Sequence, residues 1–298
     1  MNGNRFKIVG LGEILWDLLP SGKQLGGAPA NFAYVATQLG DRGSVASRVG
    51  EDSEGREAID LIRSRGVGTD LIQSDPEHPT GSVIVTFNGD QPKYEIVPDV
   101  AWDRLEFSNE WQAAAGEADA VCFGSLAQRS TASGNTIRSF LSQTRPDALR
   151  VFDVNLRCDF FDPEVLRASL GAANVAKLNN DELPVVCAMF GIVGSDENAM
   201  ASMLRAKFDL SLLCVTRGSR GSLLVTSRRM DEHRGISTEV ADTIGAGDAF
   251  TAAMTHGLLR NWPLGTISEF ANRVGSFVAS RSGAMPPFEK FMKQSGSR

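Results

Sequence analysis

Residues 242 to 250 read DTIGAGDAF, a stretch that places one carboxylate before and one after a turn of small residues. The glycines leave backbone N–H groups unobstructed, and the following AFTAAMTHGLL predicts a helix whose N-terminus carries the positive end of its dipole. Such a turn binds anions, and a phosphoryl group in transfer needs fixed hydrogen-bond donors of this kind. We therefore interpret Gly245, Ala246 and Gly247 as an anion hole for a transferring phosphoryl group.

The two acids that flank this turn suit different roles. Asp248 stands at the expected helix start, where its carboxylate could accept the proton of an attacking hydroxyl. Asp242 precedes the turn and could hold its geometry or help to bind a cation. A bare G-x-G-D is also an ordinary glycine turn with an Asp N-cap, so only the complete stretch favours catalysis.

The elements that would position this turn alternate along the chain. Short apolar runs predict strands, and most segments between them have helical spacing, such as ANFAYVATQLG, GREAIDLIRSRG and STASGNTIRSFLSQT. The runs are FKIVGL at 6–11, DAVCFG at 119–124, LRVFDV at 149–154, NVAKL at 174–178, LSLLCVT at 210–216 and GSLLVT at 221–226. The alternation predicts an α/β fold with a mostly parallel sheet and helices on both faces. Ligands bind such sheets beyond the carboxyl ends of the strands.

The segment at 81–98, GSVIVTFNGDQPKYEIVP, breaks the alternation. Two runs of period two surround Asn88 and Gly89, which predicts a β-hairpin. The apolar residues that share a face are Val83, Val85 and Phe87 in the first run and Tyr94 and Ile96 in the second. A hairpin inserted in an α/β series is a candidate lid, and an edge hairpin of the main sheet is the alternative.

Composition and charge exclude several classes of protein. The 298 residues carry a formal net charge of -6 and give a pI near 5.2, so there is no basic surface for nucleic acid. No apolar run approaches the length of a membrane span or a secretory signal, and we expect a cytoplasmic protein. The four cysteines are widely spaced without a C-x-x-C pair, which favours reduced structural thiols: Cys122, Cys158, Cys187 and Cys214.

Other catalytic motifs are missing from the sequence. GLGEIL at 10–15 begins like a dinucleotide fingerprint, but Leu15 stands where the third glycine should be. The chain contains no G-x-x-x-x-G-K-[ST] phosphate loop. Three scattered histidines are too few for a zinc cluster or a Ser-His-Asp hydrolase.

The motifs together resemble the ribokinase (PfkB) family of carbohydrate kinases. DTIGAGDAF is similar to the C-terminal signature of that family and GGAPANFAYVATQLG at 26–40 to its N-terminal signature. The segments between them also fit in order, namely GEILWD, FDVNLR, KLNNDEL, VTRGSRGS and GAMPP. The resemblance covers essentially the whole chain and is strongest to the fructokinases. It implies a single ribokinase-like domain over 1–298, with a small β lid from about 13–19 and 80–103.

The resemblance also implies roles for residues on the sugar side. Asp17, Gly27 and Asn31 match positions that hold sugar hydroxyls in the family. Arg157 follows a predicted strand, where it could clamp phosphate or sugar, and a surface arginine is the alternative. Gly27 would otherwise only form the turn into a helix.

Nucleotide and metal roles follow from the same resemblance. The positions matched to nucleotide binding are Asn155, Lys177, Thr216, Gly218, Gly221 and Asn272. Asn179 and Glu182 match an N-x-x-E motif that organises Mg²⁺ through water, although the same spacing also forms a helix capping box. Asp242 and the carbonyl of Ile244 would bind a monovalent cation such as K⁺.

The sequence thus predicts an ATP-dependent kinase that phosphorylates a primary hydroxyl of a small sugar, with fructose favoured. Kinases for ribose, 2-keto-3-deoxygluconate or a nucleoside remain alternatives, and an inactive sugar-binding regulator is the alternative that is not an enzyme. Two hairpin strands alone are marginal in water, so the apolar face needs a cover. Because the family uses such a clasp as lid and dimer contact, we expect a homodimer.

Overall fold

The computed structural model describes residues 5–20, 22–88, 91–157 and 160–295. Over these ranges the central sheet has nine strands, in the spatial order β13 (Met230–His233), β12 (Ser222–Val225), β11 (Leu212–Thr216), β10 (Val175–Asn179), β9 (Leu149–Asp153), β8 (Ala120–Gly124), β1 (Lys7–Leu11), β4 (Arg42–Gly50) and β5 (Ile72–Asp75). The strands from β11 to β5 are parallel to one another, and β12 and β13 extend the sheet antiparallel. The predicted mostly parallel sheet is confirmed.

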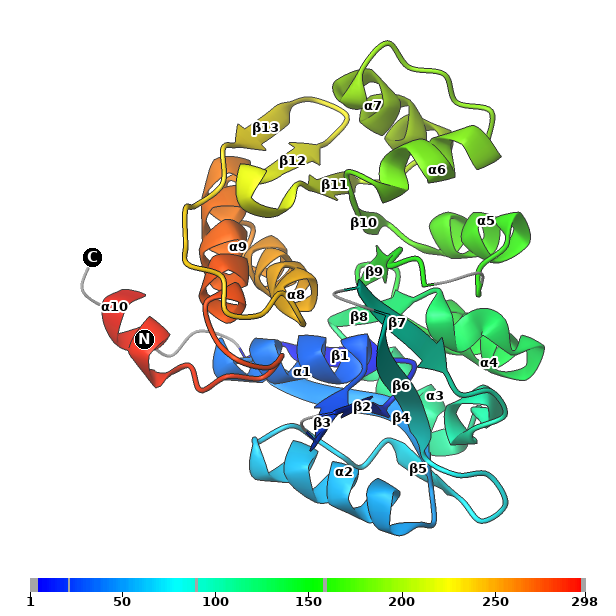
Figure 1. Ribbon diagram of the computed structural model, residues 1–298. Helices are drawn as coiled ribbons and strands as arrows, with labels where there is room; N and C mark the ends of the chain where they lie inside the picture. Colours follow the sequence, from blue (N-terminus) through cyan, green and yellow to red (C-terminus); the bar gives the residue numbers. More distant parts are fainter. Residues whose placement is uncertain (1–4, 21, 89–90, 158–159, 296–298) are drawn as a thin grey trace.

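Helices cover both faces of this sheet (Figure 1). Packed with one face are α1 (Ala28–Gln38), α2 (Ser53–Ser64), α8 (Ala246–Leu259), α9 (Leu264–Ala279) and the short α10 (Glu289–Ser295). The other face carries α3 (Asn109–Glu117), α4 (Thr131–Ser142), α5 (Pro163–Ala172), α6 (Glu182–Met189) and α7 (Glu197–Lys207). None of the helices in the described ranges combines the length and the apolar character needed to cross a bilayer.

Two hydrophobic clusters, one on each face, explain why the buried strands are apolar throughout. Successive strand residues point to opposite faces, so Val175 and Leu212 belong to the cluster with α1, α8 and α9. Their neighbours Ala176 and Leu213 belong to the cluster with α3 to α7. A strand buried on both faces therefore cannot alternate with polar residues.

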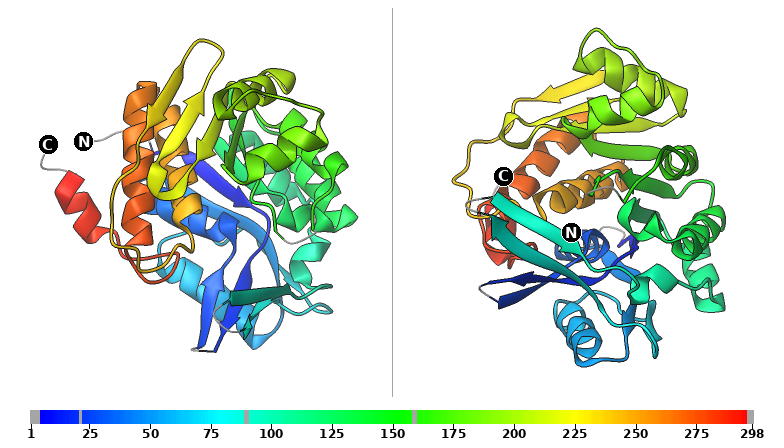
Figure 2. Two further views of the ribbon diagram at one scale, coloured as in Figure 1. Left: turned by 45° about the horizontal axis from the view of Figure 1, so that its top comes forward. Right: turned by 45° about the vertical axis from the view of Figure 1, so that its right-hand side comes forward.

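A second sheet of four strands stands apart from the central one (Figure 2). Within the described residues its spatial order is β3 (Gly22–Gly26), β2 (Leu15–Leu19), β6 (Gly81–Asn88) and β7 (Gln91–Ile96). β6 and β7 form the predicted hairpin, and the alternative of an edge hairpin on the main sheet is wrong. β3, which pairs antiparallel with β2, was not expected and extends the second sheet beyond the segments 13–19 and 80–103 that were predicted to form a lid.

The two faces of this second sheet have different surroundings. Val83 and Ile96 pair across the hairpin and are both buried, as the period-two pattern predicts. The predicted turn residue Gly89 lies outside the described residues. The structure also does not describe the side chains of three residues predicted to share the apolar face, namely Val85, Phe87 and Tyr94. On the opposite face, Trp16 packs on α2 and donates a hydrogen bond from Nε1 to the Glu54 carbonyl at 3.1 Å.

The cysteines in the described ranges agree with the predicted reduced thiols. Cys122, Cys187 and Cys214 are free and buried. Cys158 lies outside the described residues. Burial raises the pKa of the Cys187 thiol to about 11, so this thiol is protonated at neutral pH.

A buried carboxylate ties α8 to the start of β4. Asp41 is 0% exposed and accepts hydrogen bonds from Arg260 Nη2 at 2.8 Å and from the Phe6 backbone N–H at 3.3 Å. Its other oxygen lies 2.7 Å from Nδ1 of His256, a buried side chain on α8. The cluster lies at the end of α8 that is remote from Asp248, so it should affect stability and not chemistry.

We expect Asp41→Asn to lower the free energy of unfolding by about 2 to 4 kcal/mol, because His256 and Arg260 lose a buried carboxylate. Urea denaturation would measure the change. The KM values for sugar and nucleotide should stay within about twofold, since the cluster is not part of the cleft described below. A stability equal to that of the wild type would contradict the anchoring role.

Candidate active site

A cleft of about 510 Å³ opens between the second sheet and the carboxyl ends of the central strands. Its walls come from β2, β6 and β7 on one side and from the starts of α1 and α8 on the other. The predicted site residues that line it are Asp17, Gly27, Asn31, Asn155, Arg157, Lys177, Ile244, Gly245, Gly247 and Asp248. Residues from positions 17 to 248 of the chain therefore meet in one cavity.

The glycine turn before α8 needs its glycines for two different reasons. Gly245 is the N-cap residue with φ of 74°, and a Cβ there would stand 2.5 Å from Cβ of Ala284. A Cβ at Gly247 would lie 3.1 Å from Nζ of Lys177, so this glycine lets a buried ammonium approach the helix start. The N–H of Ala246 donates to the Thr243 carbonyl at 3.3 Å, which leaves those of Gly245 and Gly247 as the donors of this turn. The N-terminus of α8 thus combines backbone donors, its dipole and a positive charge, which together suit a phosphoryl group.

Asp248 lies in the first turn of α8 and is partly buried at the cleft. Its Oδ2 accepts a hydrogen bond from Nδ2 of Asn31 at 2.8 Å. Burial, followed by the negative charge of Asp153, raises the pKa of Asp248 to about 6, against the opposing hydrogen bond from Asn31. A carboxylate with this pKa is ionised at neutral pH and still basic enough to accept a proton.

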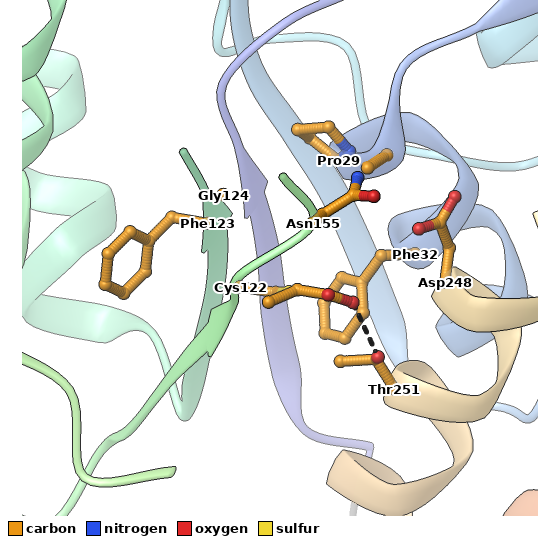
Figure 3. A pocket seen from close by; sticks show the side chains of 10 residues that line it. Pro29, Phe32, Cys122, Phe123, Gly124, Asn155, Asp248 and Thr251 are labelled. Carbon is orange, nitrogen blue, oxygen red and sulfur yellow. Dashed lines mark hydrogen bonds between the residues drawn. The ribbon is translucent and has the colours of Figure 1, made fainter. Parts of the chain in front are cut away.

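A buried ion pair supports the start of α8. Asp153 and Lys177 face each other on β9 and β10, are 4% and 6% exposed, and are joined at 3.0 Å. Thr251, one turn after Gly247, donates from Oγ1 to Asp153 at 2.8 Å. Figure 3 shows this hydrogen bond beside a small cavity that Asp248 and Thr251 also line. The first turn of α8 is therefore tied to two central strands.

The charge state of this pair follows from its geometry. Burial by itself would lower the pKa of Lys177, but the combined negative charges of Asp153, Glu182 and Asp248 outweigh burial and raise the pKa. Lys177 is thus held as an ammonium against the helix N-terminus. A permanent positive charge at this point stabilises negative charge on a bound phosphate.

Asp17 reaches the cleft from the second sheet. A Cβ at Gly26 would stand 2.5 Å from Oδ2 of Asp17, so this glycine makes room for the carboxylate on the paired strand. Burial raises the pKa of Asp17 to about 6, and the nearby charge of Arg157 opposes the rise. Arg157 itself is exposed at the rim of the cleft. A carboxylate and a guanidinium that line one cavity match a ligand with several hydroxyl groups.

Gly27 joins the second sheet to α1. It has φ of 108°, and a Cβ would stand 2.5 Å from the carbonyl oxygen of Glu13. The close approach places the start of α1, and with it Asn31, against the turn between β1 and β2.

Asn179 and Glu182 form the capping box that their spacing predicts. Oδ1 of Asn179 accepts from the Glu182 N–H at 2.8 Å, and Oε2 of Glu182 accepts from the Asn179 N–H at 2.8 Å. The second oxygen of Glu182 accepts from the Leu156 N–H at 2.8 Å. A role with Mg²⁺ would therefore have to use the remaining lone pairs of this carboxylate.

The other predicted nucleotide and cation residues do not line the cleft. Thr216 pairs with Asn179 at the carboxyl ends of neighbouring strands, followed by Gly218 and Gly221 with positive φ. Asn272 is buried, and its Nδ2 donates to Ser222 Oγ and the Ser268 carbonyl, both at 2.8 Å. Both amide hydrogens of Asn272 are thus used inside the fold.

The loop before α8 is held by the first of its two acids. Oδ1 of Asp242 accepts from the Ile244 N–H at 2.9 Å and Oδ2 accepts from the Gly283 N–H at 3.2 Å. Asp242 therefore links this loop to the turn around Gly283. The interpretation that it holds the geometry of the turn agrees with these contacts.

Three functional candidates were not identified from the sequence. Asp153 and Thr251 form the support of α8, and Glu13 is a buried acid in the cleft wall. Glu13 and Asp153 stand in the motifs GEILWD and FDVNLR, where an acid beside a buried strand end was the available signal. Thr251 looks like any polar residue of a helix, so nothing in the surrounding sequence indicated a functional role for it.

A mostly parallel α/β sheet with a separate small sheet beside an acid-bearing helix N-terminus is the arrangement of ribokinase-like sugar kinases. The chain belongs to the pfkB family of carbohydrate kinases, whose model matches residues 21–290. It is therefore a phosphotransferase of the sugar kinase class, as the sequence motifs predicted.

Relatives and solved structures agree with this family. A fructokinase of Klebsiella pneumoniae is 31% identical, over 87% of this chain and 85% of its own length. The structure of a sugar kinase from Pyrococcus horikoshii in complex with ATP is similar with a TM-score of 0.83 and 28% identity, and covers 96% of this chain and 97% of its own. A fructokinase from Vibrio cholerae with fructose, ADP and calcium has a TM-score of 0.78 and 25% identity, covering 94% of each chain.

Replacing Asp248 by Asn should lower kcat by about 10² to 10⁴-fold, because the amide keeps the size and hydrogen bonding but cannot accept a proton. In the wild type kcat should also fall as the pH drops below about 6, where Asp248 becomes protonated. Steady-state kinetics between pH 5 and 8 would measure both effects. Nucleotide affinity should change only a few fold, and a variant with more than half the wild-type kcat would rule out the role.

Thr251→Val should remove the hydrogen bond to Asp153 without changing side-chain shape. We expect kcat to fall by about tenfold, because the start of α8, with the glycine turn and Asp248, shifts relative to Lys177 and the strand ends. The conservative Thr251→Ser keeps the hydroxyl and should restore most of kcat. Kinetics and a thermal melt of both variants would separate positioning from stability. If the valine variant lost stability but kept wild-type kcat, the hydrogen bond would be structural only.

Proposed function

We propose that this sugar kinase transfers the γ-phosphoryl group of ATP to a primary hydroxyl of a small sugar, with fructose as the leading substrate. The observation that carries the proposal is the position of Asp248, which faces the cleft beside the open N-terminus of α8. Asp17 and Asn31 lie in the same cleft as polar groups for the other sugar hydroxyls. We also propose that residues 1–298 act as one kinase domain.

The reaction needs a base on one side of the sugar hydroxyl and an anion site on the other. The hydroxyl oxygen attacks the γ-phosphorus and gives its proton to Asp248, while the bond to ADP breaks. Backbone N–H groups of Gly245 and Gly247 stabilise the charge that develops on the phosphoryl oxygens, and Ala246 adds its own N–H by giving up its 3.3 Å hydrogen bond to the Thr243 carbonyl. Lys177 adds a fixed positive charge beneath this turn, and Asn31 orients Asp248 through their hydrogen bond.

The second sheet would act as the lid of this site. Leu15, Val83 and Ile96 present an apolar lining to the cleft from that side. Once a sugar is bound, this lining excludes water, which otherwise competes with the sugar hydroxyl for the phosphoryl group.

Nucleotide and metal sites are proposed on the neighbouring strand ends. Asn155, Thr216, Gly218 and Gly221 would contact the nucleotide. The arrangement of Asn272 supports a purely structural role better, because both its amide hydrogens are already donated.

Mg²⁺ fits this region only through water. Both oxygens of Glu182 accept backbone N–H groups, and within the described ranges no three His, Cys, Asp or Glu side chains gather to hold an ion directly. When bound with the nucleotide, Mg²⁺ would neutralise phosphate charge. For K⁺, the carbonyl of Ile244 and the free lone pairs of Asp242 are suitable oxygen donors.

A homodimer is supported by the outer face of the lid. Leu18 and Ile84 pair directly between β2 and β6, and they are 38% and 37% exposed. A second copy of the sheet would cover these adjacent apolar side chains. A cytoplasmic location remains part of the proposal.

We favour fructose as the substrate because fructokinases are among the relatives that align with most of the chain. Ribose, 2-keto-3-deoxygluconate and nucleosides are the enzymatic alternatives. An inactive regulator is disfavoured because Asp248 and the glycine turn are both intact.

An ADP-release assay over a panel of sugars, sugar acids and nucleosides with ATP and Mg²⁺ should give fructose the highest kcat/KM, by about tenfold or more. Asp248→Asn serves as the inactive control, and phosphate analysis of the product would identify the hydroxyl used. Sugar binding by calorimetry without turnover would favour the regulator. A higher kcat/KM for another sugar would replace fructose without changing the assigned chemistry.

A further inference from the structure

Glu13 is a buried acid that the mechanism above does not use. It stands in the connection between β1 and β2, is 4% exposed and lines the cleft. Its Oε2 has no hydrogen-bond partner among the described residues. A buried polar atom without a partner destabilises a folded protein, so its presence in a binding cleft points to a ligand as the missing partner.

Other buried acids of the described chain are arranged differently. Asp41 accepts from Arg260 and the Phe6 N–H, Asp153 pairs with Lys177 and accepts from Thr251, and both oxygens of Glu182 accept backbone N–H groups. These acids hold parts of the fold together. Oδ2 of the buried Asp75 also makes no hydrogen bond, but it is paired with Nε of Arg48 at 2.9 Å. Glu13 is the contrasting case, because its Oε2 has no hydrogen-bond partner and no ion pair with a cation among the described residues.

A second unpartnered acceptor lies in the same cleft. Oδ1 of Asn31 is buried and also has no partner among the described residues, while Nδ2 of the same amide donates to Asp248. Asn31 is one helical turn after Ala28, whose backbone N–H interacts with the Glu13 carboxyl. The two free acceptors therefore lie at the same end of α1, beside the catalytic base.

We infer that Glu13 is a sugar-binding residue that determines specificity, and that Oε2 of Glu13 and Oδ1 of Asn31 bind a sugar hydroxyl adjacent to the one that is phosphorylated. The inference rests on the proposed function and adds a residue to its sugar site. The two hydroxyl groups are adjacent because of Asn31. Its amide donates from Nδ2 to Asp248 and carries the unpartnered acceptor Oδ1, so a hydroxyl bound to Oδ1 lies next to the hydroxyl at Asp248.

The electrostatic surroundings allow Glu13 to serve as acceptor or donor. Burial raises the pKa of Glu13 to about 7, supported by the charge of Asp248 and opposed by backbone N–H groups and by Arg157. A carboxyl that can be neutral donates a hydrogen bond as well as accepting one. Such a group binds a hydroxyl, which also does both.

Glu13→Met and Glu13→Gln would test the inference, because Met keeps the length without polar atoms and Gln restores an acceptor. In Glu13→Met the kcat/KM for the best sugar of the panel should fall by about 10- to 100-fold, mainly through KM. Gln should recover part of this loss. The melting temperature of the sugar-free Met variant should not fall, because the substitution removes an unpartnered buried atom.

Monodeoxy analogues of the same sugar identify the contact. The analogue that lacks the bound hydroxyl should react poorly with the wild type, and Glu13→Met should cause no further loss with that analogue. Asp41→Asn is the matched control, since it should lower the melting temperature and leave the KM for sugar unchanged. A lower melting temperature of Glu13→Met with an unchanged KM, or equal losses with all the analogues, would overturn the inference.

Different results would contradict the proposed kinase function and the assignment of Glu13. A wild-type protein that phosphorylates no member of the panel contradicts the kinase assignment before any Glu13 variant is measured. If the wild type is active and the Glu13 variants match it in KM for every sugar, the proposed function stands and the assignment of Glu13 is wrong.

Discussion

The ion pair between Asp153 and Lys177 is the interaction on which the arrangement of the site depends. Two buried charges on neighbouring strands are stable only as a pair, and this pair needs the hydroxyl of Thr251 as a further partner. The requirement fixes α8 relative to the carboxyl ends of β9 and β10. The glycine turn proposed as the anion hole, Lys177 and the proposed base Asp248 are then held in one geometry before any ligand binds, which is the preorganisation that phosphoryl transfer needs.

The second sheet is joined to this rigid centre at closely packed glycines. Gly26 makes room for Asp17, and Gly27 approaches the Glu13 carbonyl within a distance that no Cβ could share. These contacts bring Glu13 and Asp17 into the same cleft as Asp248 of α8. Burial raises the pKa values of all three carboxyl groups. The cleft therefore gathers carboxyl groups whose pKa values lie at or just below neutral pH, so that they are basic enough to accept hydrogen bonds from hydroxyl ligands.

The buried polar groups of this protein fall into one set that stabilises the fold and another set that we assign to ligand binding. Asp41 and Asp153 have partners for their carboxylates, and they connect α8 to the sheet at both ends of the helix. Glu13 and Asn31 instead keep an acceptor without a partner in the described chain, at the edge of the cleft. A folded protein tolerates such atoms where the rest of the structure is well packed, and the two hydrophobic clusters supply that packing.

The sequence by itself determined the features that depend on neighbouring residues: the apolar strands, the amphipathic helices, the hairpin of β6 and β7, and the glycine turn before Asp248. It missed β4, where Arg48 and Ser47 interrupt the apolar pattern, because the ion pair of Arg48 with Asp75 satisfies the charge only after folding. It also missed β3, which has little apolar character and is held by pairing with β2. The tertiary structure alone decided the pairing of Asp153 with Lys177, the contact of the Thr251 hydroxyl and the buried, unpartnered acceptor of Glu13. Hydrogen bonds and burial between residues far apart in the chain leave no local pattern in the sequence.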